Sequence, residues 1–219
     1  ATPKKAPMIR AGDIIDRYKV MGKLANGGMA SVYLARDTAS PDGRHLVVLK
    51  AILPHLAANP DYVAMFEREC SVGQVAAHQN VVHIDGLLTW EGRPILVMEF
   101  LDGRNLIQVI SAARRRQQAI SFSVVGTIIA AVANALHNAW TVSEANGQQA
   151  MIVHRDISPE NVVLTYDGKV KLVDFGIAKH SHVTGDTLAG QLKGKYSYMS
   201  PEQIRGETID HRADQYSLG

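Results

Sequence analysis

Two carboxylates and one amide in the second half of the chain have the types and spacing that can bind a metal ion and accept a proton. Two β-branched runs, residues 162–165 and 170–173, flank an Asp-Gly pair, a pattern that favours a β-hairpin. Asn161 and Asp174 stand at the two ends of this hairpin, and Asp156 precedes Asn161 by five residues. Because a hairpin brings its ends together, we expect these three side chains to converge.

Oxygen ligands of this kind suit a hard cation. Carboxylate and amide oxygens are the ligands that Mg²⁺ prefers, so Asn161 and Asp174 are candidate metal ligands. A further carboxylate beside a metal–phosphate site can orient a hydroxyl and accept its proton, which is the role predicted for Asp156. The simpler alternative is a surface hairpin with acidic ends.

The sequence Val-His-Arg-Asp-Ile-Ser-Pro-Glu-Asn at 153–161, followed by Asp-Phe-Gly at 174–176, resembles the catalytic loop and metal-binding motif of protein kinases. The resemblance runs from about Tyr18 to Gly219, through at least six motifs in order. The sequence is most similar in type to bacterial Ser/Thr kinases of eukaryotic type. It implies an α+β, bilobal fold with a five-stranded antiparallel small lobe and a mainly helical large lobe. It also implies ATP and Mg²⁺ as cofactors and Ser/Thr hydroxyls of proteins as acceptors.

Length and composition limit the alternatives. Within the 219 residues we predict a flexible leader over 1–12, a small lobe over 13–99 and an incomplete large lobe over 100–219. A net charge of +2 gives no argument for a nucleic-acid partner. Cys70 is the only cysteine, which excludes an internal disulfide and fits a reducing, cytoplasmic location. The longest apolar stretch, 128–136, is too short to span a bilayer, and the N-terminus lacks both Met and a signal peptide, as in a fragment or processed chain.

A glycine-containing loop joins the first two predicted strands, 18–24 and 31–35. It reads Ala-Asn-Gly-Gly-Met-Ala from Ala25 and resembles the kinase glycine-rich loop, of whose three glycines only Gly27 is retained, with Gly28 added. Gly27 lets the backbone N–H groups approach phosphate oxygens closely. The resemblance therefore implies cofactor contacts at Ala25, Gly27 and Gly28, although an ordinary hairpin turn also fits this loop.

A lysine and a glutamate on neighbouring elements are predicted to form an ion pair. Lys50 ends an apolar strand over 46–50, and a buried ammonium needs an anionic partner. A helix is predicted over 60–77, where Phe66 and Glu69 share the core-facing side. Glu69 is thus the expected partner of Lys50, and the resemblance implies that Lys50 holds the α- and β-phosphates.

The remaining nucleotide contacts follow from the resemblance. Residues 84–89 and 95–99 are predicted strands, and Glu-Phe-Leu-Asp-Gly at 99–103 resembles the hinge whose backbone binds adenine. Met98 fits the back of that pocket, and it fits an ordinary core position equally well. The implied contacts from this part of the family pattern are Val32, Val48, Met98, Glu99, Leu101 and Val163.

The large lobe is predicted to be helical. Residues 105–118 form one helix ending in three arginines, which are either a solvated face or a dock for acidic peptides. Residues 122–142 form a long, nearly uncharged helix expected to be buried in this lobe. A polar loop over 143–150 is interpreted as a surface insertion. The chain stops at the start of the central helix, 210–219, so apolar faces are expected to be exposed and the isolated chain to be poorly stable.

The segment after Gly176 resembles a kinase activation segment that closes at Ser-Pro-Glu, 200–202. Ser181, Thr184 and Thr187 are its candidate phosphorylation sites, and Arg155 is the side chain expected to grip a phosphate there.

Two positions depart from the Ser/Thr-kinase pattern. Ser158 replaces the lysine that usually follows the catalytic aspartate by two residues, and Lys195 replaces a threonine before the Ser-Pro-Glu motif. In the family, the residues at these two positions touch each other. We therefore predict that the Lys195 ammonium supplies the positive charge that Ser158 lacks, and that Lys195 acts in catalysis. The alternatives are a pseudokinase or nucleotide-binding scaffold without transfer activity, and a small-molecule phosphotransferase, against which the Ser-Pro-Glu segment argues.

Overall fold

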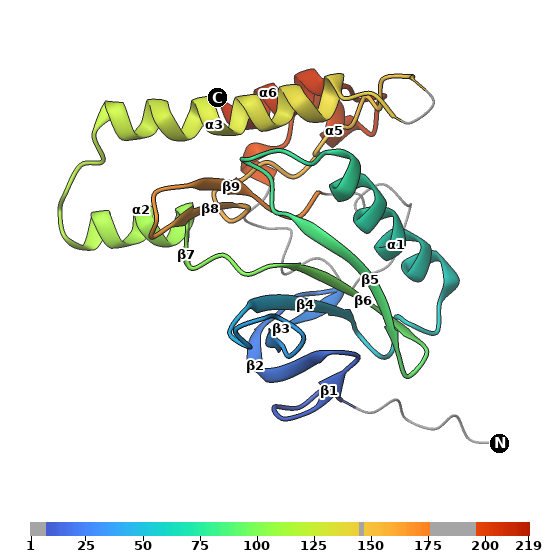
Figure 1. The fold of residues 1–219 in the computed structure, drawn as a ribbon. Helices are drawn as coiled ribbons and strands as arrows, with labels where there is room; N and C mark the ends of the chain where they lie inside the picture. The colour runs from blue at the N-terminus through green and yellow to red at the C-terminus, as the bar shows by residue number, and fades with distance from the viewer. Residues whose placement is uncertain (1–7, 145–146, 176–195) are drawn as a thin grey trace. The chain divides into compact units, whose positions relative to one another are not determined.

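The computed structural model describes residues 8–144, 147–175 and 196–219. The chain forms two compact units, drawn in Figure 1. The first contains the residues up to Gln74 together with His83–Phe100, and the second contains Val75–Val82 and Leu101–Gly219. Sequence reasoning assigned residues 75–82 to the small lobe, whereas the structure groups them with the helical unit.

The first unit contains a six-stranded antiparallel sheet, one strand more than the five predicted. The strands, in spatial order, are β1 (Ile14–Ile15), β2 (Tyr18–Asn26), β3 (Ala30–Asp37), β4 (Leu46–Ile52), β6 (Arg93–Glu99) and β5 (Ile84–Trp90). The extra strand, β1, has two residues that pair with Lys19 and Tyr18, which is too short to produce a visible alternation in the sequence. Upstream of β1, Ile9 is only 7% exposed and belongs to the core, so the end of the predicted leader is packed.

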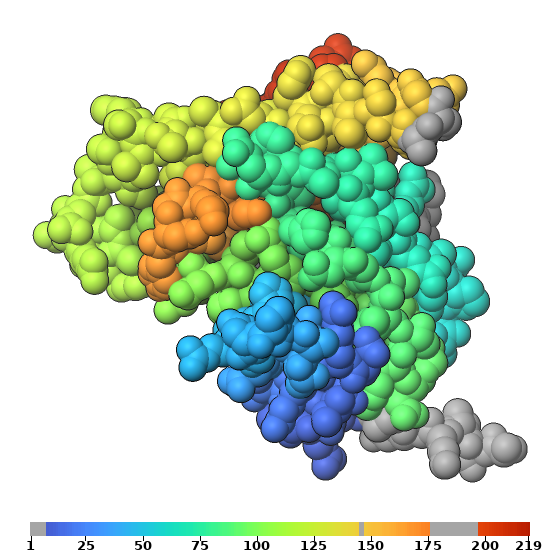
Figure 2. Space-filling view, viewed as in Figure 1, coloured from blue at the N-terminus to red at the C-terminus, as the bar shows by residue number. Residues whose placement is uncertain are grey.

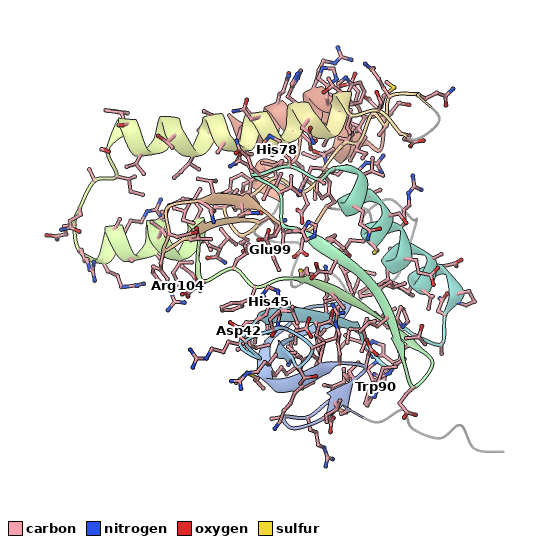
Figure 3. The ribbon with its side chains drawn as sticks, in the orientation of Figure 1. Asp42, His45, His78, Trp90, Glu99 and Arg104 are labelled. Atoms are coloured by element: carbon pink, nitrogen blue, oxygen red, sulfur yellow. The ribbon has the colours of Figure 1, made fainter. Side chains whose placement is uncertain are left out.

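The two faces of this sheet have different partners. Alternate residues of the central strands, including Leu49 on β4 and Val97 on β6, bury one face in the core of the unit. The rest of that core is formed by Ile9, Ile15, Tyr18, Val20, Tyr33, Ala35, Val47, Ala51 and Ile95. Leu88 and Trp90 of β5 pack against it, and Figure 3 labels Trp90 on the β5–β6 hairpin. The opposite face is left for Lys50 and its neighbours.

Helix α1 (Pro60–Val75) packs on the Lys50 face of the sheet. It begins where predicted, since the Asn59 side chain accepts a hydrogen bond from the N–H of Asp61 at 2.9 Å. Its contact with β5 is close, because a Cβ added to Gly73 would lie 2.2 Å from Cδ1 of Ile84. A glycine at this position lets the helix approach the strand.

The second unit contains a three-stranded sheet, β7 (Gly103–Asn105), β8 (Val162–Thr165) and β9 (Val170–Leu172). The β8–β9 hairpin is the one predicted from the sequence, and its turn places Gly168 at a φ of 87°. Strand β7 was not predicted as a strand. It pairs closely with β8, since a Cβ on Gly103 would lie 2.3 Å from the carbonyl oxygen of Leu164.

Capped helices are the main regular elements in the rest of the second unit that the structure describes. They are α2 (Leu106–Arg115), α3 (Phe122–Thr141), α5 (Pro201–Arg205) and α6 (His211–Leu218), with a 3₁₀ turn at Tyr196–Tyr198. Asn105 and Ser121 cap α2 and α3, and Ser200 and Asp210 cap α5 and α6. In the predicted insertion, the Glu144 N–H donates to the Gln148 carbonyl and the Ala150 N–H to the Val142 carbonyl.

Helix α3 is buried along one side only. Ile128, Val132, Ala135 and Ala139 face the interior, whereas Phe122 is 96% exposed. Val124, Val125 and Ile129 are exposed as well, and Figure 2 shows this end of α3 at the surface. The expected burial of this helix in the lobe therefore holds along one side only, and the expected exposed apolar residues are present on α3. Helix α3 is also the one helix in the described ranges long and apolar enough to span a membrane, a test that core helices of soluble proteins pass too.

Hydrogen bonds explain why residues 75–82 belong to the second unit. The Val82 N–H donates to the Leu172 carbonyl at 2.9 Å, and the Leu172 N–H donates to the Asn80 carbonyl at 2.8 Å. The Asn80 side chain donates to the Val170 carbonyl at 2.9 Å. Residues 80–82 and 170–172 are distant in sequence, so no local sequence pattern predicts their pairing.

Candidate active site

The first candidate residues come together in the loop before β8. The Nδ2 group of Asn161 donates to the Asp156 carboxylate at 3.0 Å and to the Asp156 carbonyl at 2.8 Å. Asn161 is buried and Asp156 is half-buried. The amide therefore fixes the Asp156 side chain and its own orientation, and it leaves the Asn161 Oδ1 oxygen directed elsewhere.

Asp174 lies at the other end of the β8–β9 hairpin. The Val173 N–H donates to the Asn161 carbonyl at 2.9 Å, which joins the backbones at the two ends as predicted. Asp174 is exposed and has a φ of 57°, a left-handed conformation that non-glycine residues rarely adopt. Its side chain is therefore displayed at the open end of the hairpin.

Asp214 of α6 binds the backbone of the catalytic loop just before Asp156. Its carboxylate accepts from the N–H groups of His154 and Arg155, each at 2.7 Å. Burial raises the pKa of Asp214, while His154 and these two N–H donors oppose that shift. The resemblance had implied this contact for Asp214, and the distances confirm it.

His154 is fully buried behind the same loop. Burial lowers its pKa, against the opposing charges of Asp214, Asp156 and Asp174, so the ring is held neutral. Its ring lies 4.7 Å from that of Phe175, and Nε2 lies 3.2 Å from the Val173 carbonyl oxygen. The histidine thus connects the catalytic loop to the residues around Asp174.

Gln203 of α5 also contacts the catalytic loop, and sequence reasoning missed it. Its Nε2 donates to the Arg155 carbonyl at 3.0 Å, and its Oε1 accepts from the Ser200 N–H at 3.0 Å. The sequence signal that could have found half of this arrangement is the capping-box spacing of Ser200 and Gln203. The contact with Arg155 spans 48 residues and has no local signature.

Ser158 is only 4% exposed, and its Oγ has no hydrogen-bond partner among the residues that the structure describes. Lys195 and the candidate phosphorylation sites Ser181, Thr184 and Thr187 lie outside those residues. The predicted exchange of roles between Ser158 and Lys195 therefore stays a prediction.

In the first unit, the predicted pair of Lys50 and Glu69 is present. The Lys50 Nζ lies 2.6 Å from Glu69 Oε1, and the side chains are 16% and 14% exposed. Strand β4 supplies the ammonium and helix α1 the carboxylate. Because both are largely shielded from water, the pair interacts more strongly than an exposed one.

The predicted nucleotide contacts of this unit share the Lys50 face of the sheet. Lys50 pairs in register with Val32 on β3, and Val48 pairs with Met98 on β6. Lys50 and Val48 are two residues apart, so all four side chains project from one face. Met98 is buried, and the core cluster occupies the opposite face, which favours Met98 as part of this surface.

The glycine loop and the hinge complete the predicted set. The Gly27 N–H donates to the Ala30 carbonyl at 2.8 Å, and Ala25, Gly27 and Gly28 are exposed. Glu99, labelled in Figure 3, is the last residue of β6. Its carboxylate accepts from the His83 N–H at 2.7 Å. Half-buried Leu101 and Val163 belong to the second unit.

The side-chain oxygens of Asn161 and Asp174 are ligand atoms of the kind that suits Mg²⁺. This ion usually takes one or two protein ligands and completes its coordination shell with water and phosphate. No group of three or more His, Cys, Asp or Glu side chains that could hold a metal occurs within 8–144, 147–175 and 196–219. Within those ranges, Asn161 and Asp174 are thus two candidate oxygen ligands at the two ends of the β8–β9 hairpin.

A two-unit α+β fold with this loop, hairpin and ion pair is that of a protein kinase. The sequence profile described as "Protein kinase domain" matches residues 18–219. The chain belongs to the protein kinase family, in its bacterial, eukaryotic-type branch.

Similar proteins are named for different acceptor residues. The chain is 42% identical to "Tyrosine-protein kinase MasK" of Myxococcus xanthus over 92% of this chain and 31% of that protein. It is 32% identical to "Probable serine/threonine-protein kinase PknB" of Lactococcus lactis over 97% of this chain and 32% of that protein. The PknI kinase domain of Mycobacterium tuberculosis superposes with a TM-score of 0.69 at 29% identity, covering 96% of this chain and 74% of that one. The chain thus spans about a third of these two curated relatives.

Proposed function

We propose that this domain transfers the γ-phosphoryl group of ATP to Ser or Thr hydroxyls of proteins, with Mg²⁺ as the metal. The observation that carries the proposal is the catalytic loop, in which the Asn161 amide holds the Asp156 carboxylate at 3.0 Å while Asp214 fixes the preceding backbone. A carboxylate held in this way is prepared to receive a proton.

In this proposal, Asp156 orients the acceptor hydroxyl and takes its proton as the oxygen attacks the γ-phosphorus. The bond between the γ-phosphorus and the β–γ bridging oxygen breaks, and ADP leaves. Lys50, positioned by Glu69, holds the α- and β-phosphates. Asn161 and Asp174 hold Mg²⁺, which when bound neutralises charge on the phosphates. Gly27 and Gly28 offer backbone N–H groups to phosphate, and the apolar side chains beside Lys50 hold the adenine.

Transfer to tyrosine is the second candidate, supported by the 42% identical relative that is named a tyrosine-protein kinase. The relatives named Ser/Thr kinases include PknB of Lactococcus lactis and PrkC of Bacillus subtilis, at 32% and 31% identity. Phosphoamino-acid analysis of casein labelled by the full-length protein separates the two, because phosphoserine, phosphothreonine and phosphotyrosine are resolved directly.

The test of transfer itself compares the wild type with Asp156→Asn. The wild type should move label from [γ-³²P]ATP to casein, and the variant should lose at least about a hundredfold in kcat, the scale of one lost acid–base group. Its affinity for ATP should be retained, since Asp156 acts on the acceptor. A wild type that binds ATP without transferring phosphate would instead support the pseudokinase alternative.

A further inference from the structure

The side-chain amide of Gln203 connects two elements of the second unit. One end belongs to the N-terminal cap of α5, where Oε1 accepts from the Ser200 N–H at 3.0 Å and the Gln203 N–H donates to Ser200 Oγ at 3.4 Å. The other end donates to the Arg155 carbonyl at 3.0 Å. A single rigid amide plane thus joins the α5 cap to the residue immediately before Asp156.

The orientation of this amide is determined by its neighbours. Turning it over would set Oε1 against the Arg155 carbonyl oxygen and Nε2 against the Ser200 N–H, and both contacts would be repulsive. Ser200 is fully buried, so water cannot easily replace its partner. Gln203 is therefore held in one orientation, with its N–H directed at the catalytic loop.

Arg155 is a position where such an anchor has an effect. It has a φ of 68°, a conformation that residues other than glycine rarely adopt. Its N–H is bound by Asp214 of α6 at 2.7 Å, and its carbonyl is bound by Gln203 of α5. Two helices thus hold the two peptide groups that flank one strained residue.

The peptide bound by Gln203 is the one that contains the Asp156 nitrogen. That N–H donates to Nδ1 of His154 at 3.3 Å, and the Asp156 carboxylate is bound by Asn161 at 3.0 Å. If the Arg155 carbonyl were released, this peptide could rotate, and the Asp156 carboxylate would move with it.

We infer that Gln203 is a positioning residue for phosphoryl transfer, whose Nε2 group holds the Arg155–Asp156 peptide and so restrains the placement of Asp156. The inference rests on the proposed function for its effect on turnover. The restraint of the loop around Arg155 by Gln203 rests on the hydrogen bond alone and does not depend on that function.

The discriminating variant is Gln203→Glu in the full-length protein. A glutamate retains the acceptor oxygen of a capping box, so α5 stays capped, but the N–H donor to Arg155 is lost. We expect kcat for casein to fall about tenfold, equal to about 1.4 kcal/mol, with KM for ATP unchanged. Hydrogen–deuterium exchange of the peptide covering 153–161 should become about tenfold faster.

Two controls separate positioning from general stability. Gln215→Glu makes the same chemical change at an exposed position on α6 and should leave kcat and exchange unchanged. Ser200→Ala removes the hydroxyl half of the α5 cap but keeps the bond to Arg155, so it should lower Tm while its kcat per folded molecule is retained.

The inference is overturned if Gln203→Glu keeps wild-type kcat, or if it only lowers Tm, as Ser200→Ala is expected to do, and keeps wild-type kcat per folded molecule. Should the wild type transfer no phosphate, the proposed function fails, and exchange at 153–161 still decides the matter. Unchanged exchange in Gln203→Glu would then refute the restraint, and faster exchange would support it.

Discussion

At the scale of single residues, Lys50 and Glu69 form an ion pair in the absence of any substrate. Lys50 Nζ lies 2.6 Å from Glu69 Oε1, and both side chains are largely shielded from water. Each charge therefore compensates the cost of burying the other. Lys50→Met keeps most of the side-chain volume but removes the ammonium that we propose acts on phosphate.

We expect Lys50→Met to reduce kcat/KM for ATP by about a hundredfold or more, the scale of one lost electrostatic stabiliser. The protein should stay folded but with a lowered Tm, because the shielded Glu69 carboxylate loses this cation. Radiolabel transfer and circular dichroism measure the two effects. Lys19→Met, at an exposed position on β2, is the matched control. Near-normal turnover in Lys50→Met would refute the assignment of Lys50.

Ser158 and Lys195 carry the second residue-scale prediction, which for Lys195 rests on sequence alone. The buried Ser158 has an Oγ without a partner in the described part of the chain, and the family has an ammonium there. If Lys195 supplies that charge from the other loop, Lys195→Thr should lower kcat about a hundredfold. Adding Ser158→Lys should then restore much of the loss.

A double-mutant cycle on kcat measures this coupling. The exchange of roles is wrong if Lys195→Thr turns over like the wild type, or if the double variant is no better than the single one. Thermal melting of all three variants serves as the control for folding.

At the scale of elements, the β8–β9 hairpin is held by the pairing of β8 with β7. Gly103 lies so close to β8 that an added Cβ would be 2.3 Å from the Leu164 carbonyl oxygen and 2.8 Å from the Cα of Thr165. Both are backbone atoms, which cannot move aside without distorting the strand pairing.

Gly103→Ala should therefore lower the free energy of unfolding by about 2 kcal/mol or more. Gly126→Ala is the matched control, because a Cβ there meets nothing within 4 Å and a helical alanine is favoured by about 1 kcal/mol over glycine. Urea denaturation of both variants tests the contrast. Equal stability of the two would contradict the close approach of β7 to β8.

At the scale of the whole molecule, the exposed apolar residues of α3 are where we expect chains to associate. Phe122, Val124, Val125 and Ile129 are exposed in one half of the helix, and exposed apolar surface promotes contacts between molecules. We expect the 219-residue chain studied alone to self-associate, and Val125→Lys with Ile129→Glu to reduce that association.

Sedimentation velocity over a range of concentrations checks this expectation. Thr127→Lys adds a charge to the same exposed helix without removing apolar surface, so it should reduce association less. A monomeric wild-type chain with a sharp, reversible thermal transition would refute the expectation.

The sequence by itself determined the features that are encoded within a few residues of one another. The β8–β9 hairpin follows from its β-branched runs and Asp-Gly turn, and the start of α1 follows from its Asn-Pro pair. The pairing of Lys50 with Glu69 followed because two charges on apolar faces each required a partner.

Only the tertiary structure decided the connections between distant segments. The Gln203 bond to Arg155 spans 48 residues, and the bond from Asn80 to Val170 spans 90. Whether α3 is buried on one side or on all sides depends on which elements pack against it, which its own composition does not encode. Local propensity and periodicity act over a few residues, whereas these contacts arise only when the chain folds back on itself.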